Sequence, residues 1–379
     1  MATVVRACMP LPPAAVASSS AAPSTDAQAQ RRSSSSSARV LVLGGTGRVG
    51  GSTATALSKL RPDLNILIAG RNLEKGESLA SKLGDESEFV QVDIRDRNML
   101  EEVLQDVDLV VHAAGPFQRE NECTVLQAAI ATKTAYIDVC DDTDYSWRAK
   151  GFHEQAKDCG IPAITTAGIY PGVSNVMAAE LVHAARSENA GEPERLRFFY
   201  YTAGTGGAGP TILTTSFLLL AEDVIAYNKG EEIKLKPYSG ALSIDFGKGV
   251  RKKDVYLLNL PEVKSAYKVL GVPTVSARFV LNFKNKQNHL VQLSALHLSI
   301  NFYWTFRSVG YATAAFVLAV LEGSTQPGVW FPEEPEGVAI ESRKVLLERA
   351  SQGTTIFVMN KPSWMIETDP KEVGLGIYV

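Results

Sequence analysis

The sequence predicts an α/β protein whose first domain is built on a parallel sheet. Residues 39–43 form a short, mostly apolar run that breaks into a glycine-rich turn, followed by a segment of helical composition. From residue 39 to about residue 166, apolar runs of strand length alternate with helical segments, the pattern of a parallel sheet with crossover helices. The alternation then stops, and an aromatic run and a second glycine loop follow, which indicates a second, mixed α/β domain.

Six strands are expected in the first domain, and they make it a complete Rossmann domain of residues 39–166. The apolar run Ile66-Leu67-Ile68 is continuous, as in strands that are buried on both faces. The expected strands are Val40–Leu43, Asn65–Ala69, Phe89–Val92, Val107–His112, Ala135–Val139 and Ile161–Thr165. The expected helices are Gly51–Leu60, Leu73–Leu83, Arg97–Leu104, Cys123–Ala131 and Phe152–Asp158.

A second domain is expected over residues 167–325, with a C-terminal segment at 326–379. Strands are predicted at Arg195–Thr202, Thr274–Asn282 and Leu290–Ser299. The glycine loop Gly204–Gly209 precedes a predicted helix. It is a mobile loop over the cleft, an anion-binding helix start at Thr211, or a plain turn. The sequence leaves open whether the C-terminal segment packs back on the first domain.

Residues 1–38 have the composition of an organellar transit peptide. They are rich in Ala, Ser and Pro and contain three Arg but only one acid, Asp26. The Ser- and Ala-rich composition favours import into the chloroplast stroma over import into a mitochondrion, and a plain disordered extension is the alternative. The whole chain has a net charge of −3 and this segment carries +2, so the remainder carries −5. A mildly acidic body gives no reason to expect nucleic acid as a partner.

The sequence also gives no sign of a metal-binding or a membrane-spanning protein. The four cysteines show no spacing typical of metal ligands, so no metal site is predicted. No apolar run reaches the roughly 18 residues that would span a bilayer. The longest is Val309–Leu321, which we expect to be a buried helix, with peripheral membrane contact as the alternative.

The turn Gly44-Gly45-Thr46-Gly47-Arg48-Val49-Gly50 is a dinucleotide-binding pattern in the strand–turn–helix setting that the pattern requires. Gly45 is expected to allow the tight turn, Gly47 the approach of a pyrophosphate, and Gly50 the close packing of the helix. The N-terminus of that helix offers free N–H groups to the phosphates. The alternative is a glycine turn that serves packing alone.

Arg71, at the end of the second strand, favours NADP(H) over NAD(H). An NAD-selective domain usually has an acid there, whereas an Arg can pair with the 2′-phosphate. The alternative is a surface ion pair of Arg71 with Glu74 or Glu77. Asp93 either contacts the adenine amino group or caps the next helix. Ala114 and Gly115, after the fourth strand, are predicted to lie against the nicotinamide-side ribose.

Four residues near the ends of strands are the catalytic candidates: Tyr170, Asn175, Asp141 and Cys140. Each has a structural alternative. Tyr170 and Asn175 could only pack, Asp141 could belong to a solvated turn, and Cys140 could be a small core residue. His112 is expected to be a core histidine. The chain contains no Tyr-x-x-x-Lys pair, which disfavours the short-chain dehydrogenase type.

Several motifs occur together in the order of one known family. They are Gly44–Gly50, Ala69-Gly70-Arg71, Ala114-Gly115-Pro116-Phe117, the stretch Gly168-Ile169-Tyr170-Pro171-Gly172-Val173-Ser174-Asn175 and Gly328-Val329-Trp330-Phe331-Pro332-Glu333. The chain resembles the saccharopine dehydrogenase-like oxidoreductases over most of residues 40–355, as a plant, plastid-type member. The resemblance implies an N-terminal NAD(P)-binding Rossmann domain, a second α/β domain beside the substrate cleft, and a homodimer.

Three functions follow as hypotheses. The first is an NADP(H)-dependent oxidoreductase that acts on a small substrate, for example an imine derived from an amino acid. The second is a non-catalytic NADP(H)-binding sensor or scaffold in the plastid, because no convincing proton donor is evident. The third is a reductase at a membrane surface, such as plastid lipid bodies, which would use residues 309–321.

Overall fold

The computed structural model describes residues 37–118, 120–187, 192–201, 219–246, 251–280 and 309–352. These residues belong to one compact unit that begins at Ser37. The predictions for the transit segment, for the glycine loop at 204–209 and for a strand at 290–299 fall outside the described residues, apart from the last two positions of the transit segment.

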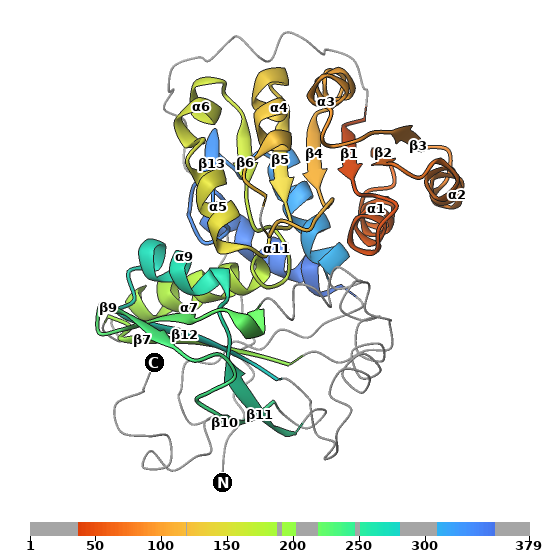
Figure 1. The fold of residues 1–379 in the computed structure, drawn as a ribbon. Coiled ribbons are helices and arrows are strands. Elements are labelled where there is room, and N and C mark those ends of the chain that lie inside the picture. Colours follow the sequence, from red (N-terminus) through yellow and green to blue (C-terminus); the bar gives the residue numbers. More distant parts are fainter. Residues whose placement is uncertain are drawn as a thin grey trace, which may run out of the picture. The chain divides into compact units, whose positions relative to one another are not determined.

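The first domain is a seven-stranded parallel sheet with helices on both faces, so the predicted fold class is confirmed (Figure 1). The strand order is β13-β6-β5-β4-β1-β2-β3. The order reverses between β1 and β4, the point at which such sheets bind ligands at their carboxyl ends. The strands are β1 Arg39–Leu43, β2 Asn65–Gly70, β3 Ser87–Gln91, β4 Leu109–His112, β5 Ala135–Asp138, β6 Pro162–Ile164 and β13 Gly328–Trp330.

Helices follow most of these strands close to the predicted positions. They are α1 Arg48–Leu60, α2 Leu73–Leu83, α3 Arg97–Leu104, α4 Thr124–Thr132, α5 Thr143–Lys150 and α6 His153–Asp158. The α5 helix was not predicted, because the run Asp141–Asp144 was considered only as a solvated turn or as part of the site. Its N-cap is Asp142, whose side chain accepts from the Tyr145 backbone N–H at 2.7 Å.

Alternate residues of the central strands enter two separate cores, one on each face of the sheet. Val40 and Val42 of β1 pack with α1, whereas Leu41 and Leu43 pack with α3 and α4. In the register of the parallel strands, Leu43 lies opposite His112, and His112 lies opposite Asp138. The strands β1, β4 and β5 therefore end at the same edge of the sheet. That edge carries the candidate site.

The chain returns to the first domain after residue 308. Helix 309–321 lies in the core that β1, β2 and β4 share with α1, ahead of the expected domain boundary at residue 325. Residues 312–320 are buried, as predicted for this apolar run. The β13 strand then pairs with β6 in parallel, and α11 Ile340–Ser351 packs against α7 Val173–Ser187.

The second domain is a mixed sheet of order β10-β11-β12-β8-β9, with β7 parallel to β12 and the other pairs antiparallel. The α7 and α9 helices share one core with β7, β8 and β12. Its strands are β7 Arg195–Tyr200, β8 Val224–Asn228, β9 Glu231–Leu235, β10 Leu242–Asp245, β11 Lys252–Leu257 and β12 Thr274–Phe279, and α9 is Pro261–Leu270.

Candidate functional site: a glycine turn and an acidic pocket at one sheet edge

The glycine turn after β1 has the close contacts that a dinucleotide site requires. Gly44 has φ +75°, and a Cβ there would stand 2.6 Å from the Ala113 carbonyl oxygen. The positive φ falls on Gly44, whereas the tight turn was assigned to Gly45. A Cβ on Gly45 would stand 2.6 Å from Ile68, and a Cβ on Gly50 would collide with the Gly44 carbonyl. Helix α1 can approach the turn this closely only because residue 50 is glycine, whereas Gly45 leaves room for the Ile68 side chain of β2.

The N-terminus of α1 is open to a phosphate. Gly47 is the N-cap, makes no side-chain capping bond and is exposed, as is Arg48. The N–H groups of the first turn therefore have no side-chain acceptor on the cap residue. Thr46 lies against Gly70, where a Cβ would stand 2.9 Å from its hydroxyl oxygen, and Val49 is half-buried. The residues present fit a pyrophosphate, but their contact with a cofactor stays a prediction.

Arg71 extends from the end of β2 into solvent. Among the described residues its guanidinium pairs with neither Glu74 nor Glu77, the alternative that the sequence left open. Its carbonyl accepts from the Gln91 amide at 3.0 Å. Asp93 does not cap α3, because Asp96 is the N-cap and Asp93 accepts from the Arg95 backbone N–H at 3.1 Å. Contact of either side chain with a nucleotide stays a prediction.

The turn after β4 lies beside the glycine turn. Ala114 is half-buried and Gly115 is exposed, while Phe117 folds back into the core. His112 is buried, which lowers its pKa to about 3 and keeps the imidazole neutral. Its Nδ1 accepts from the Ala114 backbone N–H at 3.4 Å. This histidine has a structural role, as the sequence suggested.

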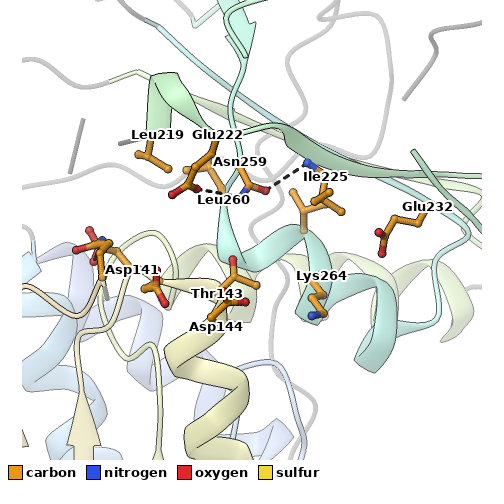
Figure 2. Close-up of a pocket in the computed structure, with 13 residues that line it drawn as sticks. Asp141, Thr143, Asp144, Leu219, Glu222, Ile225, Glu232, Asn259, Leu260 and Lys264 are labelled. Carbon is orange, nitrogen blue, oxygen red and sulfur yellow. Dashed lines mark hydrogen bonds between the residues drawn. The ribbon is translucent and has the colours of Figure 1, made fainter. Parts of the chain in front are cut away.

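An acidic pocket of about 220 Å³ opens where β4 and β5 end and faces the second domain (Figure 2). Gln118, Thr143 and Asp144 of the first domain line one side, with Asp144 in the first turn of α5. Ile225 of β8, Glu232 of β9 and Lys264 of α9 line the other. The pocket therefore lies between the sheet edge that carries the glycine turn and the second domain.

Negative charge dominates this pocket. Five carboxylates line it, from Asp141, Asp142, Asp144, Glu222 and Glu232, against the single ammonium of Lys264. Although Asp141 is exposed to solvent, the surrounding pocket atoms desolvate its carboxyl and raise its pKa, and a 2.9 Å hydrogen bond from Gln118 opposes the shift. Lys264 lies over the Trp147 ring at 5.1 Å. Such a wall favours a ligand with positive charge.

The four catalytic candidates are divided between two places. Asp141 is exposed in the pocket, whereas Cys140 is buried beneath it, and burial raises the pKa of its thiol well above the ordinary value. Tyr170 packs on Tyr200 with ring centroids 5.1 Å apart. Asn175 is 1% exposed and lies in a polar cluster between the domains. A buried thiol is a poor nucleophile, so Cys140 is best described as a core residue.

Sequence reasoning did not single out the residues that the second domain contributes to the pocket. Glu222, Glu232, Asn259 and Lys264 lie on three different segments and show no motif. They form a set only because β8, β9 and α9 fold together. The described residues contain no group of three or more His, Cys, Asp or Glu side chains that could bind a metal ion. None of the described helices combines the length and apolar character needed to cross a membrane.

Comparison with known proteins identifies the first domain. Residues 40–164 match the sequence family described as the saccharopine dehydrogenase NADP binding domain. The first domain is a saccharopine dehydrogenase-type NADP-binding domain. This match confirms the family resemblance for the first domain, about one third of the chain, whereas the plant, plastid-type assignment stays a prediction.

Two curated proteins are similar to part of this chain, at about a quarter sequence identity over the aligned part. A Mycobacterium tuberculosis protein, provisionally named a trans-acting enoyl reductase, is 27% identical over 157 residues, or 40% of this chain and 37% of that one. The carboxyaminopropylagmatine dehydrogenase of Synechocystis is 26% identical over 152 residues, or 38% and 37% of the two chains. The chain thus spans only about a third of the length of these relatives.

Two solved structures share the fold over most of the chain. Saccharopine dehydrogenase (L-Glu forming) of Saccharomyces cerevisiae has a TM-score of 0.58 at 14% identity, covering 83% of this chain and 96% of its own. Homospermidine synthase of Legionella pneumophila, solved with NAD, has a TM-score of 0.56 at 12% identity, covering 83% and 89%. Both domains therefore follow a known two-domain arrangement of the fold.

Proposed function

We propose that the protein is an NADP(H)-dependent oxidoreductase that transfers a hydride to or from a small, positively charged substrate, such as an imine derived from an amine. The observation that carries this proposal is the acidic pocket at the sheet edge that also holds the glycine turn. The names of the Synechocystis relative and of the Legionella synthase refer to amine-derived compounds, which agrees with an acidic wall.

One set of residues would bind the cofactor, and the carboxylates of the pocket would act on the substrate. The glycine turn and the α1 N-terminus would hold the pyrophosphate, and Arg71 would pair with the 2′-phosphate. When bound, NADP(H) supplies the hydride. The carboxylates of Asp141, Asp144 and Glu222 would favour a protonated, cationic imine over its neutral form, which makes the imine carbon a better hydride acceptor. A protonated imine already carries the proton that the product amine keeps.

The cofactor part is tested by calorimetry on the full chain with NADPH and NADH. NADPH should bind more tightly, and Arg71→Asp should reduce NADPH affinity about tenfold to a hundredfold with little change for NADH, because the charged pair to the 2′-phosphate is lost. Arg97→Asp on α3 changes the net charge by the same amount at an exposed site and is the matched control. An equal loss for both cofactors would show that Arg71 does not read the 2′-phosphate.

The substrate part is tested by NADPH oxidation with imines formed from a keto acid and agmatine or putrescine, compared with uncharged enoyl compounds. Turnover of the cationic imines alone supports the proposal. Tight NADPH binding without any turnover would favour the sensor or scaffold hypothesis. The membrane hypothesis has less support, because the apolar residues 312–320 are buried in the core of the first domain.

We further propose that residues 1–38 direct the protein to the chloroplast. The supporting observation is that this segment contains three Arg and only one acidic residue. A fluorescent protein fused to this segment should accumulate in plastids, and cytosolic fluorescence would contradict the proposal. The homodimer stays a prediction from the family resemblance, and light scattering of the purified protein would test it.

A further inference from the structure

Two buried glutamates face the interface between the domains. Glu262 lies in the first turn of α9 and is 0% exposed, while Glu333 follows β13 and is 1% exposed. Among the described residues, both carboxylate oxygens of Glu262 and Oε2 of Glu333 are buried without a hydrogen-bond partner. Three unpartnered acidic oxygens are exceptional in a protein interior, where polar atoms are almost always paired.

Asn175 links the two sides of this interface. It stands near the start of α7, and its Nδ2 donates to Ser265 Oγ of α9 at 3.1 Å and to Glu333 Oε1 at 3.0 Å. Its Oδ1 accepts from the Gly172 backbone N–H at 3.0 Å. Ser265 lies one turn after Glu262 and donates to the Glu262 carbonyl at 3.4 Å. One side chain therefore ties the element that carries Glu262 to Glu333 itself.

The cations nearest to Glu333 are engaged elsewhere. Arg343 of α11 donates to the backbone carbonyl of Glu333 at 2.9 Å and pairs with Glu180 of α7 at 3.4 Å. Lys150 of α5 pairs with Glu334 at 2.6 Å. No cation in the described part of the chain is bonded to the Glu333 carboxylate, and the neighbouring Glu334 adds further negative charge.

The side chain that faces Glu262 from β7 is the hydroxyl of Tyr200, which carries no charge. The hydroxyl of Tyr200 lies near the Glu262 carboxyl and favours its ionised form, but the two do not meet hydrogen-bond geometry. Tyr170 packs on the Tyr200 ring from the loop before α7. Burial raises the pKa of Glu262 to about 7, with a smaller contribution from the charge of Glu333, and burial likewise raises the pKa of Glu333 to about 7.

We propose that Glu262 and Glu333 form a proton-binding latch that holds α9 of the second domain against the segment after β13 when the pair is protonated. A buried acid in its neutral form avoids the cost of an uncompensated charge and removes the repulsion between the two carboxylates. When both ionise, that repulsion acts on α9, whose next residues, Val263 and Lys264, line the acidic pocket. The latch is independent of the proposed reaction, because it needs neither cofactor nor substrate.

The sign of the pH dependence follows from the direction of the shifts. Each folded pKa is about 7, above the ordinary value of 4.5. The stabilisation by bound protons is therefore complete below the ordinary value and is lost as the pH rises through about 7. A Gln side chain has the same shape and stays neutral, so a Glu→Gln variant does not lose this stabilisation as the pH rises.

The experiment is thermal unfolding of the full chain from pH 5 to pH 8.5, for wild type, Glu262→Gln and Glu333→Gln. Each variant should match wild type near pH 5 and unfold about 2–4 °C above it at pH 8. Glu341→Gln, an exposed position on α11, is the matched control and should follow wild type throughout. Variants that are less stable than wild type at pH 8 would overturn the latch.

Two further measurements keep the outcome decisive. The infrared spectrum of wild type at pH 6 should contain a carboxylic acid C=O band that weakens on going to pH 8.5 and is reduced in each variant. Loss of the band in wild type can be read even if a variant does not fold, and a pH-independent spectrum would refute the proposal. If K⁺, Mg²⁺ or Ca²⁺ raises the unfolding temperature of wild type at pH 8 but not that of the variants, the pair binds a cation and not a proton.

Discussion

Asp138 and the Glu262–Glu333 pair are buried acids with opposite surroundings. Asp138, at the end of β5, is 0% exposed and accepts four hydrogen bonds. Its donors are the backbone N–H groups of Cys140 and Thr166 and the hydroxyls of Thr165 and Tyr136, at 2.8–3.1 Å. Among the described residues, one donor, Asn175, meets hydrogen-bond geometry with the carboxylates of the two glutamates. Burial is equal in the two regions, so donors decide how costly ionisation is.

Burial raises the pKa of all three acids by similar amounts, from 3.8 to about 6 for Asp138 and from 4.5 to about 7 for each glutamate, and the four donors act against the shift at Asp138. The two regions therefore differ in how the ionised carboxylate is held and not in the size of the shift. At neutral pH Asp138 is therefore mostly ionised and serves as an acceptor that organises the chain after β5 and β6. The glutamates are poised to change charge. The same residue chemistry thus gives a structural anchor in one region and a titrating interface in the other.

The largest effect should come from removing the anchor. Asp138→Ala leaves four donors without an acceptor in a closed interior, and we expect a loss of about 3–5 kcal/mol in the free energy of unfolding. Urea denaturation at pH 7 measures it. Asp106→Ala, at an exposed position, should change the free energy by less than about 0.5 kcal/mol. A small loss at Asp138 would mean that water readily replaces the carboxylate, and the contrast between the regions would fail.

The next effect concerns the interdomain cluster. Asn175→Asp keeps the acceptor for the Gly172 N–H but removes both donors and adds a third acid beside the glutamates. We expect a loss of about 3 kcal/mol at pH 8 and a smaller loss at pH 5, where the acids are protonated. Denaturation at both pH values provides the test. A loss that does not depend on pH would show that the cluster is not a titrating unit.

A smaller, pH-dependent effect is expected for Asp138→Asn. The folded pKa of Asp138 is about 6, above the ordinary 3.8, so wild type loses proton-linked stability between these values and the amide does not. The variant should be less stable than wild type at pH 4, by about 1–2 kcal/mol, because an amide cannot satisfy all four donors. The gap should narrow by pH 7. A gap that widens with pH would mean that the donors outweigh burial.

The smallest stability effect is expected in the open pocket. Asp144→Asn removes one exposed carboxylate near the N-terminus of α5, and the free energy of unfolding should fall by less than about 0.5 kcal/mol. Binding of putrescine, used as a dicationic probe in calorimetry, should weaken severalfold, because one of five carboxylates is lost. Asp106→Asn is the exposed control. Unchanged putrescine binding would remove the electrostatic argument for a cationic substrate.

The first domain was largely predictable because its signals are local. The glycine turn, the continuous apolar strands and the spacing of helices all depend on neighbours in sequence, and they located β1, β2 and α2 within one or two residues. The acidic run after β5 was harder to interpret, because Asp142 acts as a helix cap and the α5 helix has little apolar periodicity. Asp141 was found by its place after a strand.

The sequence alone determined the parallel first domain, the dinucleotide turn and the candidates Arg71 and Asp141, because each depends on a short pattern of backbone or charge. The tertiary structure decided which residues of the two domains come into contact. Glu222, Glu232 and Lys264 meet Asp141 only when β8, β9 and α9 fold beside the edge of the first sheet. Glu333 reaches the neighbourhood of Glu262 only because the chain returns to add β13. Such long-range contacts set burial and charge, and no local pattern encodes them.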